Sequence, residues 1–363
     1  MRTLNLGRSD SCAIKFHYLR PMQLDEKYMR RCIELALLGQ GRVAPNPMVG
    51  AVIVHNDRII GEGYHEKYGE AHAEVNAIAN VDDQTLLKDA TIYVSLEPCA
   101  HTGKTPPCAD LLVHHQFKRV VIGCLDSFSL VSGKGIERLK HAGIETLVGC
   151  IENECRTLNK HFFTFHEKKR PYVLLKWAQT SNGKIDQGLS DGKVTWISAP
   201  ETQTMVHTWR KNCQAILVGR NTVEKDNPSL TVRAVKGKNP IRIVLDSELQ
   251  LPMKMNCFND EASTIVLNKL KSETGGTIEY VQLEALSPQL ILEALVERNI
   301  QSVLIEGGRA TLQSFIDANL WDEAKVIMGA VKFNQGTDAP SLNASEDHEE
   351  RFFGDTIKTY FKR

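Results

Sequence analysis

Apolar residues in the first part of the chain recur at spacings that predict alternating helices and strands. Over residues 25–38 they repeat every three or four positions, the period of an amphipathic helix, until the glycines at 39 and 41. The apolar run 49–54 predicts a strand, and His55, Asn56 and Asp57 predict a hairpin turn after it. Further helices are expected at 71–80, 108–115 and 135–142, and further strands at 91–96, 120–124 and 146–148. This alternation predicts an α/β sandwich of about 150 residues.

The alternation restarts after a charged segment, residues 166–171, that ends in a proline and is typical of a domain boundary. Strands are expected at 172–177, 215–219, 241–245, 264–267, 279–283, 302–305 and 325–328, and helices at 200–212, 288–299 and 310–319. We therefore predict two α/β domains, residues 22–166 and 171–363. Residues 1–21 are basic and lack periodicity. They are expected to be a disordered extension, with a weak transit peptide or a true start at Met22 as alternatives.

The charge balance and the cysteine content narrow the partners and the compartment. Lys and Arg number 44, as do Asp and Glu, so the chain lacks the overall positive charge that non-specific nucleic-acid binding needs. No apolar run approaches the ~18 residues of a membrane span, and no secretory signal begins the chain. We expect a cytoplasmic protein with neither nucleic acid nor membrane as partner. There, clustered cysteines indicate metal binding or catalysis rather than disulfides.

One group of residues predicts zinc chemistry. It comprises His72 and Glu74, at the start of an expected helix, Cys99 after Pro98, and Cys108. Imidazole and thiolate are good zinc ligands, and three of them leave the fourth tetrahedral position open for water. Zinc lowers the pKa of that water towards ~7, and a carboxylate that does not bind the metal can shuttle protons. Zinc-dependent base deaminases use an H-x-E and P-C signature of this kind. We therefore predict hydrolytic deamination, with Glu74 as the catalytic residue.

Other interpretations of these residues remain open at this point. His-Ala-Glu alone can be an ordinary helix start, and a single Pro-Cys is weaker still. The protein could be a zinc-dependent nucleoside or tRNA deaminase with an unrelated C-terminal domain. Against this, nucleic-acid deaminases usually separate their cysteines by two residues, whereas eight intervene here. The zinc could also be purely structural, in a binding protein, although structural sites normally have four protein ligands.

The run from Leu96 to Cys108, together with Pro45-Asn46-Pro47-Met48-Val49-Gly50, resembles the deaminase half of the bifunctional riboflavin-biosynthesis deaminase/reductase family. The resemblance implies a small-molecule substrate, a diaminopyrimidinone that carries a ribosylamino phosphate. It also implies that Asn46 holds the pyrimidine edge, that His65 and Lys104 contact the substrate and its phosphate, and that His101 lies near the metal. Read alone, these residues could equally be a turn residue, a surface histidine and a solvated loop charge.

The second half carries no G-x-G-x-x-G fingerprint, so a nicotinamide site there rests on resemblance. Gly307 and Gly308 before an expected helix suit a phosphate, but ordinary turn use is the commoner reason for such a pair. Residues from Pro171 to about Ala330 resemble the reductase half of the same family, which has a dihydrofolate-reductase-like fold and uses NADPH. The resemblance implies an enzyme that is both hydrolase and oxidoreductase. It would deaminate the pyrimidine and then reduce the ribosyl side chain to a ribityl chain.

Carried over position by position, the resemblance predicts the reductase site. The cofactor-binding residues would be Ala178, Trp196, Thr222, Asp226, Ser247, Gly308, Arg309, Ala310 and Thr311. The substrate-binding residues would be Arg210, Leu230, Arg233 and Glu306, the two arginines facing the ribose phosphate. Val194 stands where the family often has serine, which removes one expected hydrogen bond. Asp226 and Glu306 are the candidate proton donors, and a homo-oligomer is expected.

Overall fold

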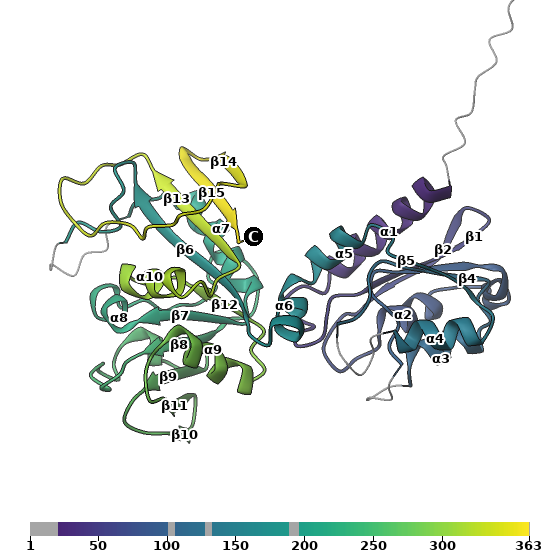
Figure 1. Ribbon diagram of the computed structural model, residues 1–363, viewed down its shortest axis with the longest axis horizontal. Helices are drawn as coiled ribbons and strands as arrows, with labels where there is room; N and C mark the ends of the chain where they lie inside the picture. The colour runs from purple at the N-terminus through teal and green to yellow at the C-terminus, as the bar shows by residue number, and fades with distance from the viewer. Residues whose placement is uncertain (1–20, 101–105, 128–132, 189–195, 363) are drawn as a thin grey trace, which may run out of the picture.

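The computed structural model describes residues 21–100, 106–127, 133–188 and 196–362, which build two sheets, one in each half of the chain (Figure 1). The first sheet has five strands in the order β2 (Arg58–Tyr64), β1 (Gly50–His55), β3 (Thr91–Val94), β4 (Arg119–Ile122) and β5 (Glu145–Val148). β1 pairs antiparallel with β2 and β3, and β3, β4 and β5 are parallel. The expected hairpin turn forms at Asn56 and Asp57, whose φ angles of 50° and 58° suit these residue types.

Helices cover both faces of this sheet because successive strand residues point to opposite sides. Ile53, Ile92 and Val120 pack on the face that carries α2 (Ala73–Ala79), α3 (Cys108–His114) and α4 (Lys134–His141). Val52, Tyr93 and Val121 pack on the opposite face. That face carries α1 (Pro21–Leu37), α5 (Glu152–Leu158) and α6 (Lys160–Lys168). A short turn of helix, η1 (Gln84–Asp89), precedes β3. The predicted α/β sandwich is confirmed.

The second sheet has ten strands. Their order is β10 (Glu273–Gly275), β11 (Ile278–Gln282), β9 (Thr264–Asn268), β8 (Ile241–Leu245), β7 (Ala215–Gly219), β12 (Ser302–Ile305), β6 (Tyr172–Thr180), β13 (Glu323–Gly329), β15 (Asp355–Phe361) and β14 (His348–Phe352). The strands from β11 to β13 are parallel, and the pairs at both edges are antiparallel. A parallel sheet of this kind gathers its loops for ligand binding at the carboxyl ends of its strands.

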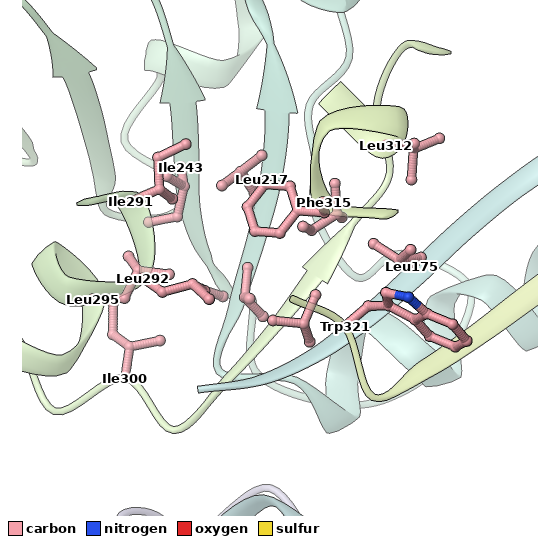
Figure 2. Packing of buried hydrophobic residues seen from close by; sticks show 14 of the residues in the cluster. Leu175, Leu217, Ile243, Ile291, Leu292, Leu295, Ile300, Leu312, Phe315 and Trp321 are labelled. Carbon is pink, nitrogen blue, oxygen red and sulfur yellow. The ribbon is translucent and has the colours of Figure 1, made fainter. Parts of the chain in front are cut away.

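One face of this sheet is packed by α9 (Pro288–Glu297) and α10 (Arg309–Asp317). Figure 2 shows Leu217 and Ile243 from the strands against Ile291 of α9 and Phe315 of α10. The opposite face holds α7 (Pro200–Asn212), α8 (Arg220–Asp226) and the short η2 (Asn256–Phe258). Both faces are therefore buried, which explains why the central strands are almost uninterrupted apolar runs.

The junction between the halves differs from the expected linker. Residues 166–168 are the last turn of α6, so only Lys169, Arg170 and Pro171 separate that helix from β6. The charges there are paired rather than solvated. Arg170 and Lys168 bind the buried carboxylate of Asp322, and Lys160 binds the neighbouring buried Glu323. Charge composition alone cannot distinguish these two situations.

The first helix also starts earlier than expected, because Pro21 is already helical, whereas residues 1–20 lie outside the described residues. Across the described ranges, none of the helices combines the length and the apolar character needed to cross a bilayer.

Candidate active sites

The predicted zinc ligands come together from three separate segments. His72 directly precedes α2, Cys99 lies in the loop after β3, and Cys108 is the first residue of α3. One ligand atom from each lies within 4.8 Å of the other two. The His72 Nδ1 atom is 3.3 Å from the Cys108 Sγ atom and 3.6 Å from the Cys99 Sγ atom. Among the described residues, this is the only group of three or more His, Cys, Asp or Glu side chains with metal-binding geometry.

These distances fit a tetrahedral zinc ion. Zinc binds thiolate sulfur at about 2.3 Å and imidazole nitrogen at about 2.0–2.1 Å, so tetrahedral angles put the two donor atoms about 3.6 Å apart. The two observed nitrogen–sulfur distances, 3.3 and 3.6 Å, are close to this value. The donor set therefore fits zinc, with three protein ligands and a fourth position left for a reactant.

The surroundings of Cys99 and Glu74 shift the pKa values of these two side chains in opposite directions. Hydrogen bonds from the Cys108 thiol, from His72 and from the Cys108 backbone N–H lower the pKa of Cys99 to about 4, although burial opposes them. Cys99 is then a thiolate, the form that binds metal. Burial, reinforced by the charge of Cys99, raises the pKa of Glu74 to about 7. A carboxyl group with such a pKa can both accept and donate a proton near neutral pH.

Asn46 and His65 form a pair beside this centre. The His65 ring is buried, and its Nδ1 atom lies 3.0 Å from the carbonyl oxygen of Ala71. Because a carbonyl can only accept, Nδ1 carries the proton and Nε2 accepts from the Asn46 amide, 3.2 Å away. Burial also lowers the pKa of His65, which keeps the ring neutral. Both ring nitrogens are thus used within the protein, and His65 holds Asn46 in place. The expected Lys104 and His101 lie outside the described residues.

The second group of predicted residues gathers at the carboxyl ends of the parallel strands. β7 ends at Gly219, and β12 leads through Glu306, Gly307 and Gly308 into α10. The Gly308 backbone N–H donates to the Thr222 hydroxyl at 2.9 Å. A Cβ on Gly219 would lie 2.7 Å from the Thr311 hydroxyl, so a larger residue at this position would displace the Thr311 side chain. Two segments that carry glycine and threonine, 219–222 and 307–311, therefore meet where a nucleotide phosphate could bind.

The expected substrate side contains a nearly buried ion pair. The Arg210 guanidinium donates two hydrogen bonds to the Glu306 carboxylate, from Nε at 2.9 Å and from a terminal nitrogen at 2.6 Å. It donates a third, at 3.2 Å, to the Thr231 carbonyl. Burial alone would raise the pKa of Glu306, but the charges of Arg210 and Lys176 lower it to about 2. Glu306 is consequently ionised at neutral pH and is an acceptor, which argues against the expected role of proton donor.

The other predicted reductase residues differ in how far they are buried. Arg233 is exposed, and its backbone N–H donates to the His207 Nδ1 atom at 3.1 Å. Leu230 has a φ of 54°, and its side chain is buried in the core. Trp196 is 61% exposed, and burial raises the pKa of Asp226 at the end of α8. Ala178 lies in β6, Ser247 follows β8, and Arg309 and Ala310 open α10. Val194 lies outside the described residues.

Two residues near Glu306 were not among the predicted site residues. Burial lowers the pKa of Lys176, which lies in β6 within reach of the charges of Glu306 and Arg210. His207 lies on α7 one turn before Arg210, and burial and the charges of Arg210 and Arg233 lower its pKa to about 4. The sequence does contain a signal for each. Lys176 is the one charge in the apolar run 172–178, and His207 shares a helix face with Arg210.

Comparison with known proteins supports both halves. A family model described as the cytidine and deoxycytidylate deaminase zinc-binding region matches residues 22–124, and the RibD C-terminal domain matches residues 171–341. With the zinc-fitting triad and Glu74, these matches define a zinc-dependent deaminase joined to a reductase domain. The chain belongs to the RibD family of riboflavin biosynthesis proteins. It is 40% identical to the Aquifex aeolicus protein over 356 residues. This match covers 94% of the present chain and 99% of the Aquifex protein.

Other relatives give the same result. A Bacillus amyloliquefaciens RibD is 40% identical over 334 residues, 89% of each chain. A crystal structure from Thermotoga maritima, 38% identical, covers 95% of this chain and all of that one with a TM-score of 0.87. An Acinetobacter baumannii RibD structure is 31% identical, and the match covers 94% of this chain and 99% of that one with a TM-score of 0.84. The protein is thus a bifunctional deaminase and reductase of riboflavin biosynthesis that uses zinc and NADPH.

Proposed function

We propose that the first half deaminates a diaminopyrimidinone carrying a ribosylamino phosphate, and that the second half reduces the ribosyl side chain of the product to a ribityl chain. The observation that carries the deaminase proposal is the His72, Cys99 and Cys108 triad with the buried Glu74 beside it. The substrate is supported by the Thermotoga maritima relative, which is described as a diaminohydroxyphosphoribosylaminopyrimidine deaminase and 5-amino-6-(5-phosphoribosylamino)uracil reductase.

In the deaminase site, His72, Cys99 and Cys108 would hold zinc, which supplies Lewis-acid activation of water when bound. Glu74 takes a proton from the attacking water and delivers it to the departing amino group, so that water adds to the ring carbon and ammonia leaves. Asn46 donates or accepts at the pyrimidine edge, in the orientation that His65 imposes. Lys104 remains the proposed phosphate contact.

In the reductase site, NADPH supplies the hydride, and the protein orients it. The segments around Gly219, Thr222 and Gly308–Thr311 would hold its phosphates, with Ala178, Trp196, Asp226, Ser247, Arg309 and Ala310 around them. Arg233 is an exposed residue whose guanidinium donates a long hydrogen bond, 3.4 Å, to the Thr231 hydroxyl, and it is the proposed ligand of the substrate phosphate. Arg210 is less available for this role because Glu306 occupies its bidentate face. Leu230 would contribute through its backbone.

The proton for the ring oxygen of the sugar needs a donor other than Glu306. Asp226, whose pKa is raised by burial, stays an expected candidate. Lys176 is a second one, because burial lowers its pKa and so makes its ammonium group a better acid than a free lysine. The ionised Glu306 would accept a hydrogen bond from a sugar hydroxyl instead. When bound, NADPH would supply the hydride to the sugar carbon, and the protein's proton donor would protonate the ring oxygen as the bond between that oxygen and the carbon breaks.

Of the alternatives considered above, an unrelated C-terminal domain is contradicted by the match of residues 171–341 to the RibD C-terminal domain. A non-catalytic binding protein is contradicted by membership of an enzyme family. The homo-oligomeric state, the cytoplasmic location and the lack of nucleic-acid or membrane partners stay predictions.

The proposal is tested by incubating the purified, zinc-loaded protein with the diaminopyrimidinone ribosylamino phosphate, with and without NADPH. Ammonia and the absorbance of the reduced nicotinamide are followed together. We expect ammonia release without NADPH, and NADPH oxidation only once deaminated product is present. Ammonia without NADPH oxidation would contradict the reductase proposal, and the absence of ammonia would contradict the proposed substrate.

A further inference from the structure

The loop that carries Asn46 is attached to the rest of the protein at each of its ends. After the loop, the Asn159 carboxamide makes two hydrogen bonds to the backbone of Met48, one to its N–H and one to its carbonyl, each 2.8 Å long. Asn159 is buried between α5 and α6. The loop is thus fixed on this side by the segment that leads into the second half of the chain.

On the other side, the loop is held by a residue of the reductase domain. The Gln301 side-chain Nε2 atom donates to the Pro45 carbonyl oxygen at 2.9 Å, and that carbonyl belongs to the peptide group that joins Pro45 to Asn46. Gln301 is 5% exposed and directly precedes β12. Its backbone is itself fixed, because its N–H donates to the Gln214 side chain and its carbonyl accepts from the Tyr172 N–H.

The Asn46 N–H donates to the Val43 carbonyl oxygen at 2.9 Å, so the Gln301 contact adds a second hydrogen bond to the same peptide group. Asn46, Pro47 and Met48 line one side of a cavity of about 740 Å³ between the two domains, and Gln301 lines it as well. A segment beside an open cavity can shift until directional contacts stop it. The contact from Gln301 acts on the peptide group adjacent to the side chain that must face the pyrimidine.

We propose that Gln301 is a positioning residue for the deamination reaction, contributed by the reductase domain to the site of the other domain. It fixes the Pro45–Asn46 peptide group and thereby the direction of the Asn46 amide. His65 fixes the same amide from within the deaminase domain. This inference rests on the proposed role of Asn46 in substrate binding.

The test compares Gln301→Met and Gln301→Glu in the full-length protein with the control Gln289→Met. Methionine has nearly the same volume but no donor, and an ionised glutamate has the same length but only acceptors. Gln289 is exposed on α9 of the same domain, where its amide donates to the Glu293 carboxylate at 2.7 Å. Initial rates of ammonia release, rates of NADPH-dependent reduction of separately supplied deaminated product, and zinc content are measured for each.

We expect both Gln301 variants to raise the KM of deamination about five- to tenfold, the effect of one lost buried hydrogen bond, with a smaller change in kcat. Zinc content, the KM for NADPH and the reductase rate stay unchanged, as do all parameters of Gln289→Met. A deamination KM within about twofold of wild type in both variants would overturn the inference. So would a parallel loss of both activities or of zinc, which indicates a general structural role.

Asn46→Ala separates this inference from the proposed function. If Asn46→Ala impairs deamination and the Gln301 variants do not, only the positioning role is wrong. If Asn46→Ala leaves the deamination KM unchanged, the proposed role of Asn46 is wrong, and the positioning role with it.

Discussion

Arg210 on α7 and Glu306 after β12 form a two-pronged ion pair with both side chains largely withdrawn from water, at 13% and 7% exposure. The pair joins a helix to the carboxyl end of a central strand, at the place where the substrate of the reductase is expected. Removing one partner of a buried ion pair leaves the other charge uncompensated, which costs about 3–5 kcal/mol. The pair should therefore be sensitive to substitution in a way that surface ion pairs are not.

Arg210→Ala is expected to lower the kcat/KM of reduction by at least about a hundredfold, because Glu306 would lose its main counter-charge and its orientation. Burial would then raise the pKa of Glu306 above its present value. The reductase rate is measured with deaminated product and NADPH. Arg351→Ala, on the exposed edge strand β14, is the matched control for a lost surface arginine. An unaltered reductase rate in Arg210→Ala would contradict the proposed site.

Glu74→Gln is expected to reduce deamination by about two to four orders of magnitude, since an amide cannot move the proton. Zinc content and thermal stability should stay close to wild type, because Glu74 is not among the residues proposed to bind the metal. Ammonia release and zinc content are measured on the same sample. Persistent deamination would show that another group moves the proton.

Removal of zinc by a chelator is expected to abolish deamination and to leave reduction intact. The three proposed ligands all belong to the five-stranded half, whereas the residues proposed for reduction belong to the ten-stranded sheet. Reductase activity is measured with deaminated product before and after dialysis, and zinc is then added back. Reduction that disappears with the metal would mean that the two halves are more interdependent than this arrangement implies.

His161 provides a prediction about stability and pH. Burial and the neighbouring charge of Lys160 lower its pKa to about 4, and its ring packs on Tyr172. The unfolded chain has a histidine pKa of about 6.5, so between these values only the unfolded state is protonated. The stabilising contribution is fully present above pH ~6.5 and is lost as pH falls towards ~4, by roughly 3 kcal/mol at most.

Urea unfolding of the wild type and of His161→Phe at pH 7 and pH 5 checks this prediction. Phenylalanine keeps an aromatic ring against Tyr172 and cannot be protonated. The decrease in unfolding free energy between the two pH values should be smaller in the variant. Equal decreases would show that other groups, such as His207, account for the pH dependence in this range.

The sequence was sufficient for the elements and ligands that depend on local pattern. The strands at 215–219, 241–245 and 302–305 and the helix at 200–212 have the predicted bounds, because each is a continuous apolar or amphipathic run. The proposed zinc ligands could be identified because their residue types are rare in that combination. The helices α5 and α8 and the strands β10, β14 and β15 were missed, since many of their residues are polar and their faces are only partly buried. The helix α6 was missed for another reason, because its charged end was interpreted as a linker although Phe162, Phe163 and Phe165 are buried.

Contacts between distant segments could not be predicted in the same way. Nothing near Gln301 indicates that its amide meets Pro45, more than 250 positions earlier in the chain. Nor does the sequence around Arg210 indicate that its guanidinium is bound to Glu306 rather than free to bind a phosphate. Such pairings are set by how the two sheets and their helices are placed, which a single sequence does not specify.

The ion pairs at the junction also bear on attempts to use either half by itself. A gene fragment that began at Tyr172 would encode every strand of the ten-stranded sheet, yet it would lack Lys168 and Arg170. Asp322, 6% exposed, would then be a buried carboxylate without either of its cations, and Glu323 would lose Lys160. A fragment that starts at Lys160 instead would retain all three cations. The helix α6 therefore serves both halves, because its lysines bind carboxylates of the ten-stranded half while Phe162 and Phe163 pack on the five-stranded sheet. Neither half keeps all of its contacts when the chain is divided there.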